Sequence, residues 1–243
     1  MKIVTWNCNG AFRNKFHEII KLQADLYVIQ ECENPAYILN NDLASHFDNR
    51  YLWQGKSKNR GIGVFSANPA FEIEPIHIDV SPLEQFFFFS VKSEVSFPVI
   101  ATWTKQANSP TFQYIGQLWK LLNEHGKQLE FPFSILIGDL NSNKKWDIWD
   151  RWWNHSDVVS HLERLGLRSA YHEHFQESQG EESQATLYLH RNIEKAHHID
   201  YAFLERSWLV ENVAVGKPEE WLSLSDHMPV LIEVRAKERQ MGV

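Results

Sequence analysis

The chain has 243 residues, 43% of them hydrophobic and 13% aromatic, with a formal net charge of −7. This length and composition support a large buried core, exclude disorder as the main state, and predict a single domain over residues 1–243. The acidic balance argues against a broad basic face that coats nucleic acid, but it does not exclude a phosphate-bearing substrate.

Strands and short helices alternate along the first half of the chain. A strand at residues 2–6 and a helix face at 16–20 come first. An Asn-Pro pair at residue 34 predicts a helix through about His46, and a Ser-Pro pair at residue 109 opens another that Gly126 can close. The other strands predicted here are 26–30, 61–66, 72–79, 85–91 and 98–104, the last four spaced as a meander.

The second half is predicted to be richer in strands. Residues 156–165 form a helix that Gly166 stops, and strands are predicted at 134–137, 187–189, 199–204, 209–215 and 229–234. Antiparallel strands with helices between the two halves predict two packed sheets flanked by helices.

Five polar clusters lie at the ends of predicted strands. They are Asn7 and Asn9 in TWNCNG, Glu31 in VIQE, Asp139 and Asn141 in LIGDLNSN, Asp200 in HHIDYAF, and Asp226 with His227 in LSDHMPV. Each alone is a weak signal, because a GDLN turn usually only closes a strand. The two-residue period of a strand points Asn7 and Asn9 the same way, and likewise Asp139 and Asn141, which favours a shared site.

Carboxylates, amides and one imidazole are the groups that metal-assisted hydrolysis of a phosphodiester needs. Glu31 and Asp226 offer hard oxygen donors suited to Mg²⁺ or Mn²⁺. Asn7 and Asn9 add neutral amides that can ligate or orient without raising the negative charge.

The ordered set TWNCNG, IQE, GDLNSN, HIDYAF and SDHMPV resembles the endonuclease/exonuclease/phosphatase superfamily, which includes apurinic endonucleases, pancreatic-type deoxyribonucleases, phosphatases and deadenylases. The resemblance spans nearly the whole chain. It implies an α+β fold, a four-layer α/β/β/α sandwich of two packed mixed β-sheets flanked by helices, with a divalent-metal phosphoesterase site at one edge.

The resemblance also implies a role for each polar residue. It implies Glu31 as the principal metal ligand, Asp139 as the residue that activates or orients the attacking water, and Asn141 as a donor to the same phosphate. Asp226 is assigned to the metal with Asn9, and Asn7 is a further catalytic candidate. His227 would contact the phosphate, and Asp200 would hold its imidazole protonated.

One block departs from the family pattern, because Trp103 stands where many members have a His or Tyr. An indole donates one hydrogen bond but takes no proton, so Trp103 is a candidate substrate contact, with a core position as the alternative. Lys105, Tyr114 and Arg13 are further candidates for substrate binding. Glu33 stands where the apurinic endonucleases have a Lys, which argues against cleavage at abasic sites.

Other conspicuous residues are interpreted as structural. In KKWDIWDRWW, Trp146, Trp149 and Trp153 fall at helical spacing, and a core stripe is favoured over stacking on bases. The basic loop residues Lys56, Lys58 and Arg60 are expected to be solvated. Four histidines, His172, His174, His197 and His198, fit no common zinc spacing, and Cys8 and Cys32 are expected to be buried thiols.

The sequence therefore predicts a divalent-metal phosphodiester hydrolase, first a nuclease acting on DNA or RNA. The alternative is a phosphatase or phosphodiesterase acting on a small phosphorylated metabolite or nucleotide, and a non-catalytic binding module is third. No window is apolar enough to span a membrane, and MKIVTWNCNG lacks the apolar stretch of a secretory signal, so we expect a cytoplasmic monomer without a membrane partner.

Overall fold

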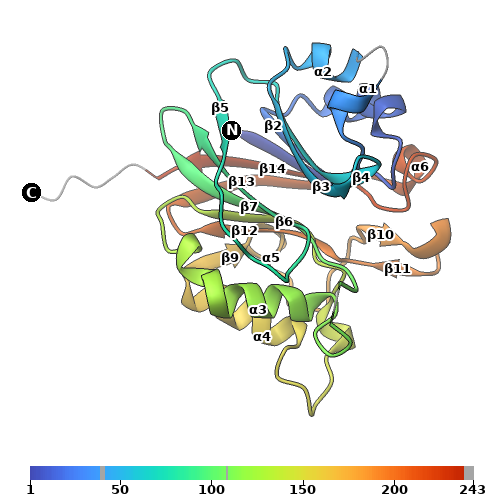
Figure 1. Cartoon of the computed structure of the whole chain (residues 1–243). Coiled ribbons are helices and arrows are strands. Elements are labelled where there is room, and N and C mark those ends of the chain that lie inside the picture. Colours follow the sequence, from blue (N-terminus) through green and yellow to red (C-terminus); the bar gives the residue numbers. More distant parts are fainter. Residues whose placement is uncertain (39–41, 108, 238–243) are drawn as a thin grey trace, which may run out of the picture.

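The computed structural model describes residues 1–38, 42–107 and 109–237, which form two six-stranded mixed sheets packed face to face with helices outside them (Figure 1). The first sheet has the order β13-β14-β1-β2-β4-β3. Its strands are β1 (Lys2–Asn7), β2 (Leu26–Cys32), β3 (Tyr51–Ser57), β4 (Arg60–Ser66), β13 (Trp208–Val215) and β14 (Val230–Ala236). The predicted sandwich is confirmed.

The second sheet has the order β5-β6-β7-β8-β12-β9. Its strands are β5 (Glu72–Pro75), β6 (Phe86–Lys92), β7 (Phe97–Trp103), β8 (Ile135–Asp139), β9 (Leu167–Ser169) and β12 (Asp200–Glu205). Each sheet contains one parallel pair, β1 with β2 and β7 with β8, so their carboxyl ends lie side by side. A two-stranded sheet of β10 (Leu187–Tyr188) and β11 (Ala196–His197) stands at one end.

Helices cover the outer faces of both sheets. The α-helices are α1 (Phe16–Ile19), α2 (Asp42–His46), α3 (Ile115–His125), α4 (His155–Arg164), α5 (Ala170–Phe175) and α6 (Pro218–Trp221). The 3-10 turns are η1 (Phe12–Asn14), η2 (Ile20–Leu22), η3 (Pro35–Tyr37), η4 (Gly126–Leu129), η5 (Lys144–Trp146) and η6 (Leu189–Arg191). Apolar residues of α1, α2 and α6 pack on the first sheet, and those of α3 and α4 pack on the second.

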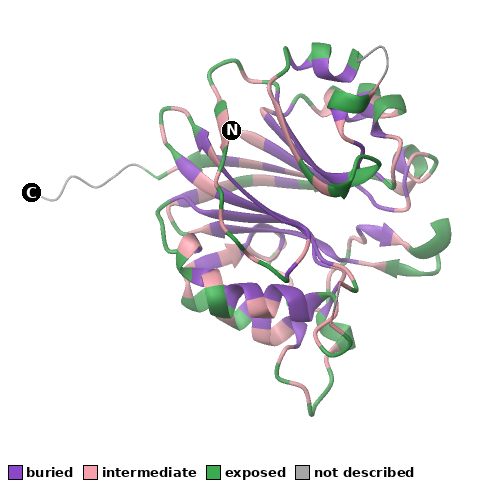
Figure 2. Cartoon of the chain, in the orientation of Figure 1, coloured by how far each residue is buried: buried purple, intermediate pink, exposed green. Residues whose placement is uncertain are grey.

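The alternation of side chains along the strands separates three apolar layers. Ile3 of β1, Val28 of β2 and Ile137 of β8 belong to the layer between the sheets, while Val4 and Leu136 face the outer helices. The buried residues run through the middle of both sheets in Figure 2. Because Asn7 and Asp139 keep the phase of Ile3 and Ile137, they also point inward, at the end of the layer between the sheets.

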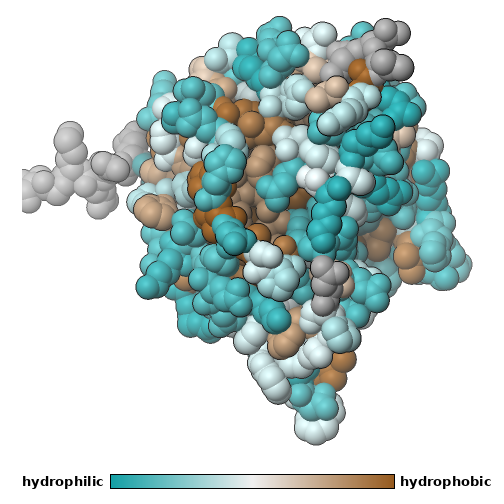
Figure 3. Space-filling view, in the orientation of Figure 1, coloured by the Kyte–Doolittle hydropathy of each residue, from teal (hydrophilic) through white to brown (hydrophobic). Residues whose placement is uncertain are grey.

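The opposite end of the sandwich, where β7 and β8 begin, holds a mainly apolar cavity of about 790 Å³. Phe88, Phe97, Val99 and Phe133 are among its lining residues. Figure 3 shows apolar surface gathered in the middle of an otherwise hydrophilic face. This cavity is remote from the ends of the strands that carry the polar clusters.

Several predicted elements are wrong in extent. The helix expected over 34–46 is the turn η3 and the separate α2, because Ile38 is extended; residues 39–41 lie outside the described residues. The helix expected from 109 begins at Ile115, and the strand expected over 72–79 ends at Pro75. Strand β3 was not predicted, and β4 pairs with β2 and β3 in the first sheet, so only β5, β6 and β7 form the meander.

The tryptophan tract forms no core helix, which corrects the prediction of an apolar stripe. Asn143 caps η5 by accepting from the backbone N–H of Lys145, and extended Asp147 ends the turn after three residues. A new helix, α4, begins only at His155. Trp149 is consequently 96% exposed.

Candidate active site

The polar clusters meet where β1, β2 and β8 end and β12 begins. Asp139, the last residue of β8, is the cross-strand partner of Asp200, the first residue of the antiparallel β12. Gly138 makes this strand end possible: its φ is +141°, and a Cβ there would lie 1.9 Å from the carbonyl oxygen of Thr102. Only glycine fits so close to β7.

Glu31 is turned toward the site by a β-bulge. The pairing of β2 with β4 shifts between Gln30 and Cys32, which leaves Glu31 as the extra residue, with a φ of +57°. A bulge re-aims the side chain of the extra residue, and a left-handed conformation is costly for glutamate. Such strain at a side chain in a polar cluster is typical of a functional position.

Asn7 joins the clusters of the two sheets. Its Nδ2 donates to Asp139 Oδ2 over 3.0 Å and to Glu31 Oε1 over 3.3 Å, and its Oδ1 accepts from the backbone N–H of Asn9 over 3.0 Å. Asn9 Nδ2 then donates to Asp226 Oδ1 over 3.0 Å. One amide network therefore connects Glu31, Asp139 and Asp226.

Asp139 is fully buried and held from two sides. The backbone N–H of Asn141 donates to its Oδ1 over 2.7 Å, and Asn141 Nδ2 donates both to its Oδ2 and to the carbonyl oxygen of Thr104. Burial, together with the charge of Asp200, raises the pKa of Asp139 to about 7, although His227, Asn7 and Asn141 act in the opposite direction. Asn141 thus positions Asp139, since both its amide hydrogens are engaged.

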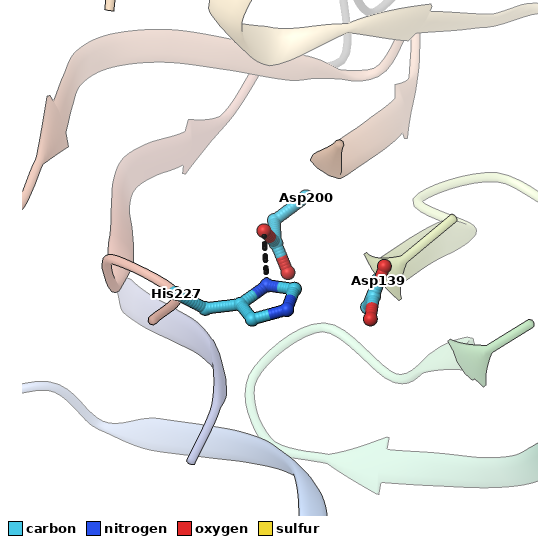
Figure 4. Close-up of side chains that lie close together, drawn as sticks. All are labelled: Asp139, Asp200 and His227. Atoms are coloured by element: carbon cyan, nitrogen blue, oxygen red, sulfur yellow. Dashed lines mark hydrogen bonds and ion pairs between the residues drawn. The ribbon is translucent and has the colours of Figure 1, made fainter. Parts of the chain in front are cut away.

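His227 forms an ion pair with Asp200, with Nδ1 2.9 Å from Oδ2 (Figure 4). Burial alone would lower the pKa of His227, but the charge and hydrogen bond of Asp200, with Asp139 and Asp226, outweigh it and raise the pKa to about 10. The imidazole is therefore protonated at neutral pH. Asp200 Oδ1 is buried without a hydrogen-bond partner among the described residues.

Two residues that sequence reasoning missed hold this pair. Ser225 Oγ donates to the carbonyl oxygen of Asn7 and accepts from the backbone N–H of His227. Thr186 Oγ1 accepts from the backbone N–H groups of Ile199 and Asp200. The Ser in SDH was visible as part of the motif, whereas nothing in the local sequence marks Thr186.

Asp139, Asp200 and His227 form a buried group whose potential ligand atoms lie within 4.8 Å of one another, and such a group can hold a metal ion. Glu31 and Asp226 extend the group with carboxylate oxygens at its edge. Oxygen donors fit a hard divalent cation, while a protonated imidazole does not ligate, which favours the carboxylate side of the site for ligation.

Arg60, expected to be a solvated loop charge, instead reaches the site. Its Nη1 lies 2.6 Å from Glu31 Oε2, in an ion pair whose angles are not those of a hydrogen bond. The side chain comes from the tip of the β3–β4 hairpin and remains half exposed. The signal that could have found Arg60 is its position as the first residue of β4, the strand that pairs with β2 at the bulge.

Among the candidate substrate-binding residues, Trp103 is a core residue, 7% exposed, in the layer between the sheets. The register of β7 with β8 places it beside Asp139. Lys105 Nζ lies 4.9 Å from the Trp103 ring centroid, and the Lys105 carbonyl oxygen accepts from the backbone N–H of Tyr114. Arg13 is paired with the buried Glu33, which also accepts from the backbone N–H groups of residues 12 and 13.

Two of the four histidines set aside as non-ligands form hydrogen bonds near the loop before β10. His172 Nε2 lies 3.2 Å from Glu182 Oε1, and His198 Nδ1 donates to the carbonyl oxygen of Gln184. Burial lowers the pKa of His198 to about 4, so its imidazole is neutral. Cys8 and Cys32 are buried free thiols, as predicted.

Two packed mixed sheets with a buried carboxylate and imidazole site at one edge define a phosphoesterase with a DNase I-like fold. The Endonuclease/Exonuclease/phosphatase family profile matches residues 4–227. The chain belongs to this family of phosphoesterase enzymes, which confirms the resemblance found in the sequence.

Solved structures share the fold over almost the whole chain. The 3′ phosphatase NExo from Neisseria, bound to a product DNA hairpin, is 18% identical with a TM-score of 0.69, covering 97% of this chain and 99% of its own. Humanized D. rerio TDP2 is 16% identical with a TM-score of 0.68, covering 97% and 99%. An AP endonuclease from Archaeoglobus fulgidus is 17% identical with a TM-score of 0.65, covering 96% and 98%.

The search of curated proteins found no significant match. Along the part of the chain that the structure describes, no helix is both long and apolar enough to cross a membrane.

Proposed function

We propose that this phosphoesterase is a Mg²⁺- or Mn²⁺-dependent nuclease that hydrolyses phosphodiester bonds of DNA or RNA. The observation that carries the proposal is the buried Asp139 carboxylate, held by Asn7 and Asn141 beside the Asp200–His227 ion pair. An oriented carboxylate supplies a water-orienting group, and a protonated imidazole supplies a donor to the charge that develops on phosphate.

The metal ligands in this proposal are Glu31 and Asp226, with Asn9 beside them. Their oxygens suit a hard cation, and the amide network from Asn7 ties both carboxylates to Asp139. A bound cation would neutralise phosphate oxygens and lower the pKa of a water molecule. Asp139 orients the attacking water, His227 Nε2 donates to a phosphate oxygen, and Asp200 keeps the imidazole protonated.

A nucleic-acid substrate is supported by two of the similar structures, one described as bound to a product DNA hairpin and one as an AP endonuclease. The cations of Arg60 and Lys105 near the site favour a substrate with more than one phosphate. The second candidate is a phosphatase or phosphodiesterase acting on a small phosphorylated metabolite or nucleotide. The net charge of −7, which repels a long polyanion, favours it.

One panel of substrates separates these functions. With Mg²⁺ or Mn²⁺, we expect cleavage of DNA or RNA, measured on labelled single-stranded and double-stranded substrates, and little phosphate release from nucleotides or inositol phosphates. Glu31→Gln should remove most of this activity and weaken Mn²⁺ binding in calorimetry. Glu18→Gln, an exposed acid paired with Lys21, is the matched control. Phosphate release without polynucleotide cleavage would support the second candidate instead.

We also propose that the protein is a monomer in the cytoplasm. In that compartment its two buried thiols stay reduced. Cell fractionation and light scattering test both statements, and recovery outside the cytoplasm or a dimer mass would contradict them.

A further inference from the structure

Aromatic side chains are exposed on one loop that begins next to the site. In the tryptophan loop, residues 144–153, Trp149 is 96% exposed, Trp152 63% and Trp146 43%. Burying large aromatic side chains is strongly favourable, so three exposed indoles on ten residues are unusual for a free surface. In Figure 1 the yellow loop before α4 protrudes at the bottom of the view.

Hydrogen bonds hold the backbone of the tryptophan loop in one conformation. Asn154 Oδ1 accepts from the backbone N–H of Ile148 over 2.9 Å and from Arg151 Nε over 2.8 Å. Asn154 Nδ2 donates to the carbonyl oxygens of Ile148 and Arg151. Asp147 accepts from the backbone N–H groups that open α4. The loop therefore presents Trp149 on a fixed scaffold, which lowers the entropy cost of binding.

Both ends of the tryptophan loop are anchored to the body of the protein. Trp153 packs on Phe112, with ring centroids 4.7 Å apart, and Trp146 contacts His197 at 5.0 Å. At the start of the loop, Asn143 donates to the carbonyl oxygen of His198, only two residues after Asn141, which holds Asp139. The loop is thus continuous with the candidate active site.

The charges of the tryptophan loop suit a phosphate backbone. Lys144, Lys145 and Arg151 are its cations, and one of its two acids, Asp147, is engaged with the backbone of α4. Indoles and cations on a loop that follows the candidate active site in the sequence are the elements of a surface for single-stranded nucleic acid, where bases stack on aromatic rings and phosphates pair with cations.

We propose that the tryptophan loop binds unpaired bases of a nucleic-acid strand, with Trp149 and Trp152 as stacking rings, and thereby directs single-stranded segments to Asp139. The inference rests on the proposed nuclease function and narrows its substrate class. Paired bases leave no open face for these rings, so discrimination between single strands and duplex follows.

Binding is measured without hydrolysis, by fluorescence anisotropy of a labelled single-stranded oligothymidylate in EDTA, beside a blunt-ended DNA duplex of the same length. We expect the unaltered protein to prefer the single strand. Trp149→Ala should weaken that binding between about 5-fold and about 150-fold, the range for one lost stacking ring. Trp149→Tyr should restore most of it. Phe131→Ala, which removes a 55% exposed aromatic at the opposite end of β8, should leave it unchanged.

Three results would overturn the inference. The first is equal affinity of Trp149→Ala and the unaltered protein for the single strand, and the second is an equal loss of affinity for the duplex. The third is Trp149-dependent binding to vesicles of phosphatidylserine and phosphatidylcholine but not to oligonucleotide. Hydrolysis of bis(p-nitrophenyl) phosphate with Mn²⁺ by the unaltered protein is measured separately. Its absence would contradict the proposed function, whereas the anisotropy result stands by itself because no metal is present.

Discussion

At the scale of single residues, the pKa values in the site depend on how close its charged groups lie to one another in a buried volume. Asp139 and Asp200 are cross-strand partners, and burial together with their mutual repulsion raises the pKa of Asp139 to about 7. The His227 cation offsets part of this repulsion. The arrangement is stable only because each acid has at least one donor directed at it.

Replacing Asp139 with Asn tests its role directly. Asp139→Asn keeps the shape of the side chain but removes the group proposed to orient water, so turnover should fall by on the order of 10² or more while substrate affinity is retained. Steady-state kinetics and a binding titration measure the two effects. Turnover within a few-fold of the unaltered protein would exclude the role.

Arg60→Gln tests whether the Arg60 guanidinium competes with a metal cation for Glu31. Without the guanidinium 2.6 Å from Glu31 Oε2, a cation has one fewer competitor, and Mn²⁺ affinity in calorimetry should rise by roughly 2- to 5-fold, the equivalent of a half-exposed ion pair. Affinity for a polyanionic substrate should fall. Lys58→Gln, on the same hairpin over the ring of Tyr37, is the control. A loss of Mn²⁺ affinity in Arg60→Gln would show that Arg60 supports Glu31 instead.

At the scale of elements, the ends of neighbouring strands bring the site together. The pairing of β7 with β8 sets Trp103 beside Asp139, and Gly138 lets the two backbones approach. The same strands that fill the core with Val99, Ala101 and Ile137 therefore end in the site. Packing and function share these strands, so a change at one strand end affects both.

Trp103→Ala separates packing from substrate contact. Because the indole is 7% exposed in the core, truncation should cost roughly 3 to 5 kcal/mol of unfolding free energy. The Michaelis constant of the fraction that stays folded should change little. Thermal or urea unfolding beside steady-state kinetics measures both, and an unchanged stability with a raised Michaelis constant would restore Trp103 as a substrate contact.

At the scale of the whole molecule, buried titratable groups tie stability to pH. His198 is fully buried with its pKa lowered to about 4, mainly by burial. The unfolded chain, with a histidine pKa of about 6.5, takes up this proton first as the pH falls. The stability that neutral His198 contributes is therefore present above pH 6.5 and is lost between pH 6.5 and pH 4.

From this difference we expect His198 by itself to contribute a loss of about 2 kcal/mol of unfolding free energy at pH 5 relative to pH 7.5, whereas the raised pKa values of Asp139 and His227 contribute with the opposite sign. His198→Asn, which keeps a donor for the Gln184 carbonyl oxygen, should remove the His198 contribution, so the variant should lose less stability, or gain more, than the unaltered protein as the pH falls. Urea unfolding at a series of pH values from 5 to 7.5 measures the slope. Equal slopes in both proteins would refute the assignment of the pH dependence to His198.

The sequence alone predicted the sandwich, the positions of most strands along the chain and the five polar clusters, because two-residue alternation and strand-end polar residues are local signals. It did not predict β3, the short α2 or the late start of α3, where capping and turn geometry compete with hydrophobic spacing. The tryptophan tract shows the limit of prediction from hydrophobic spacing. Helical spacing indicated a core stripe, but hydrogen bonds of Asn143 and Asn154 hold the tract as a loop.

The sequence by itself determined which residues are candidates for the site and which family the chain belongs to, because five motifs in a fixed order carry that information. Only the tertiary structure decided which groups meet: the Asp139–Asp200 register, the ion pair of Arg60 with Glu31, the support of Thr186 and Ser225, and the burial of Trp103. The physical reason is that a pKa, an ion pair or an exposed ring depends on distances between residues far apart in the sequence, which local patterns do not contain.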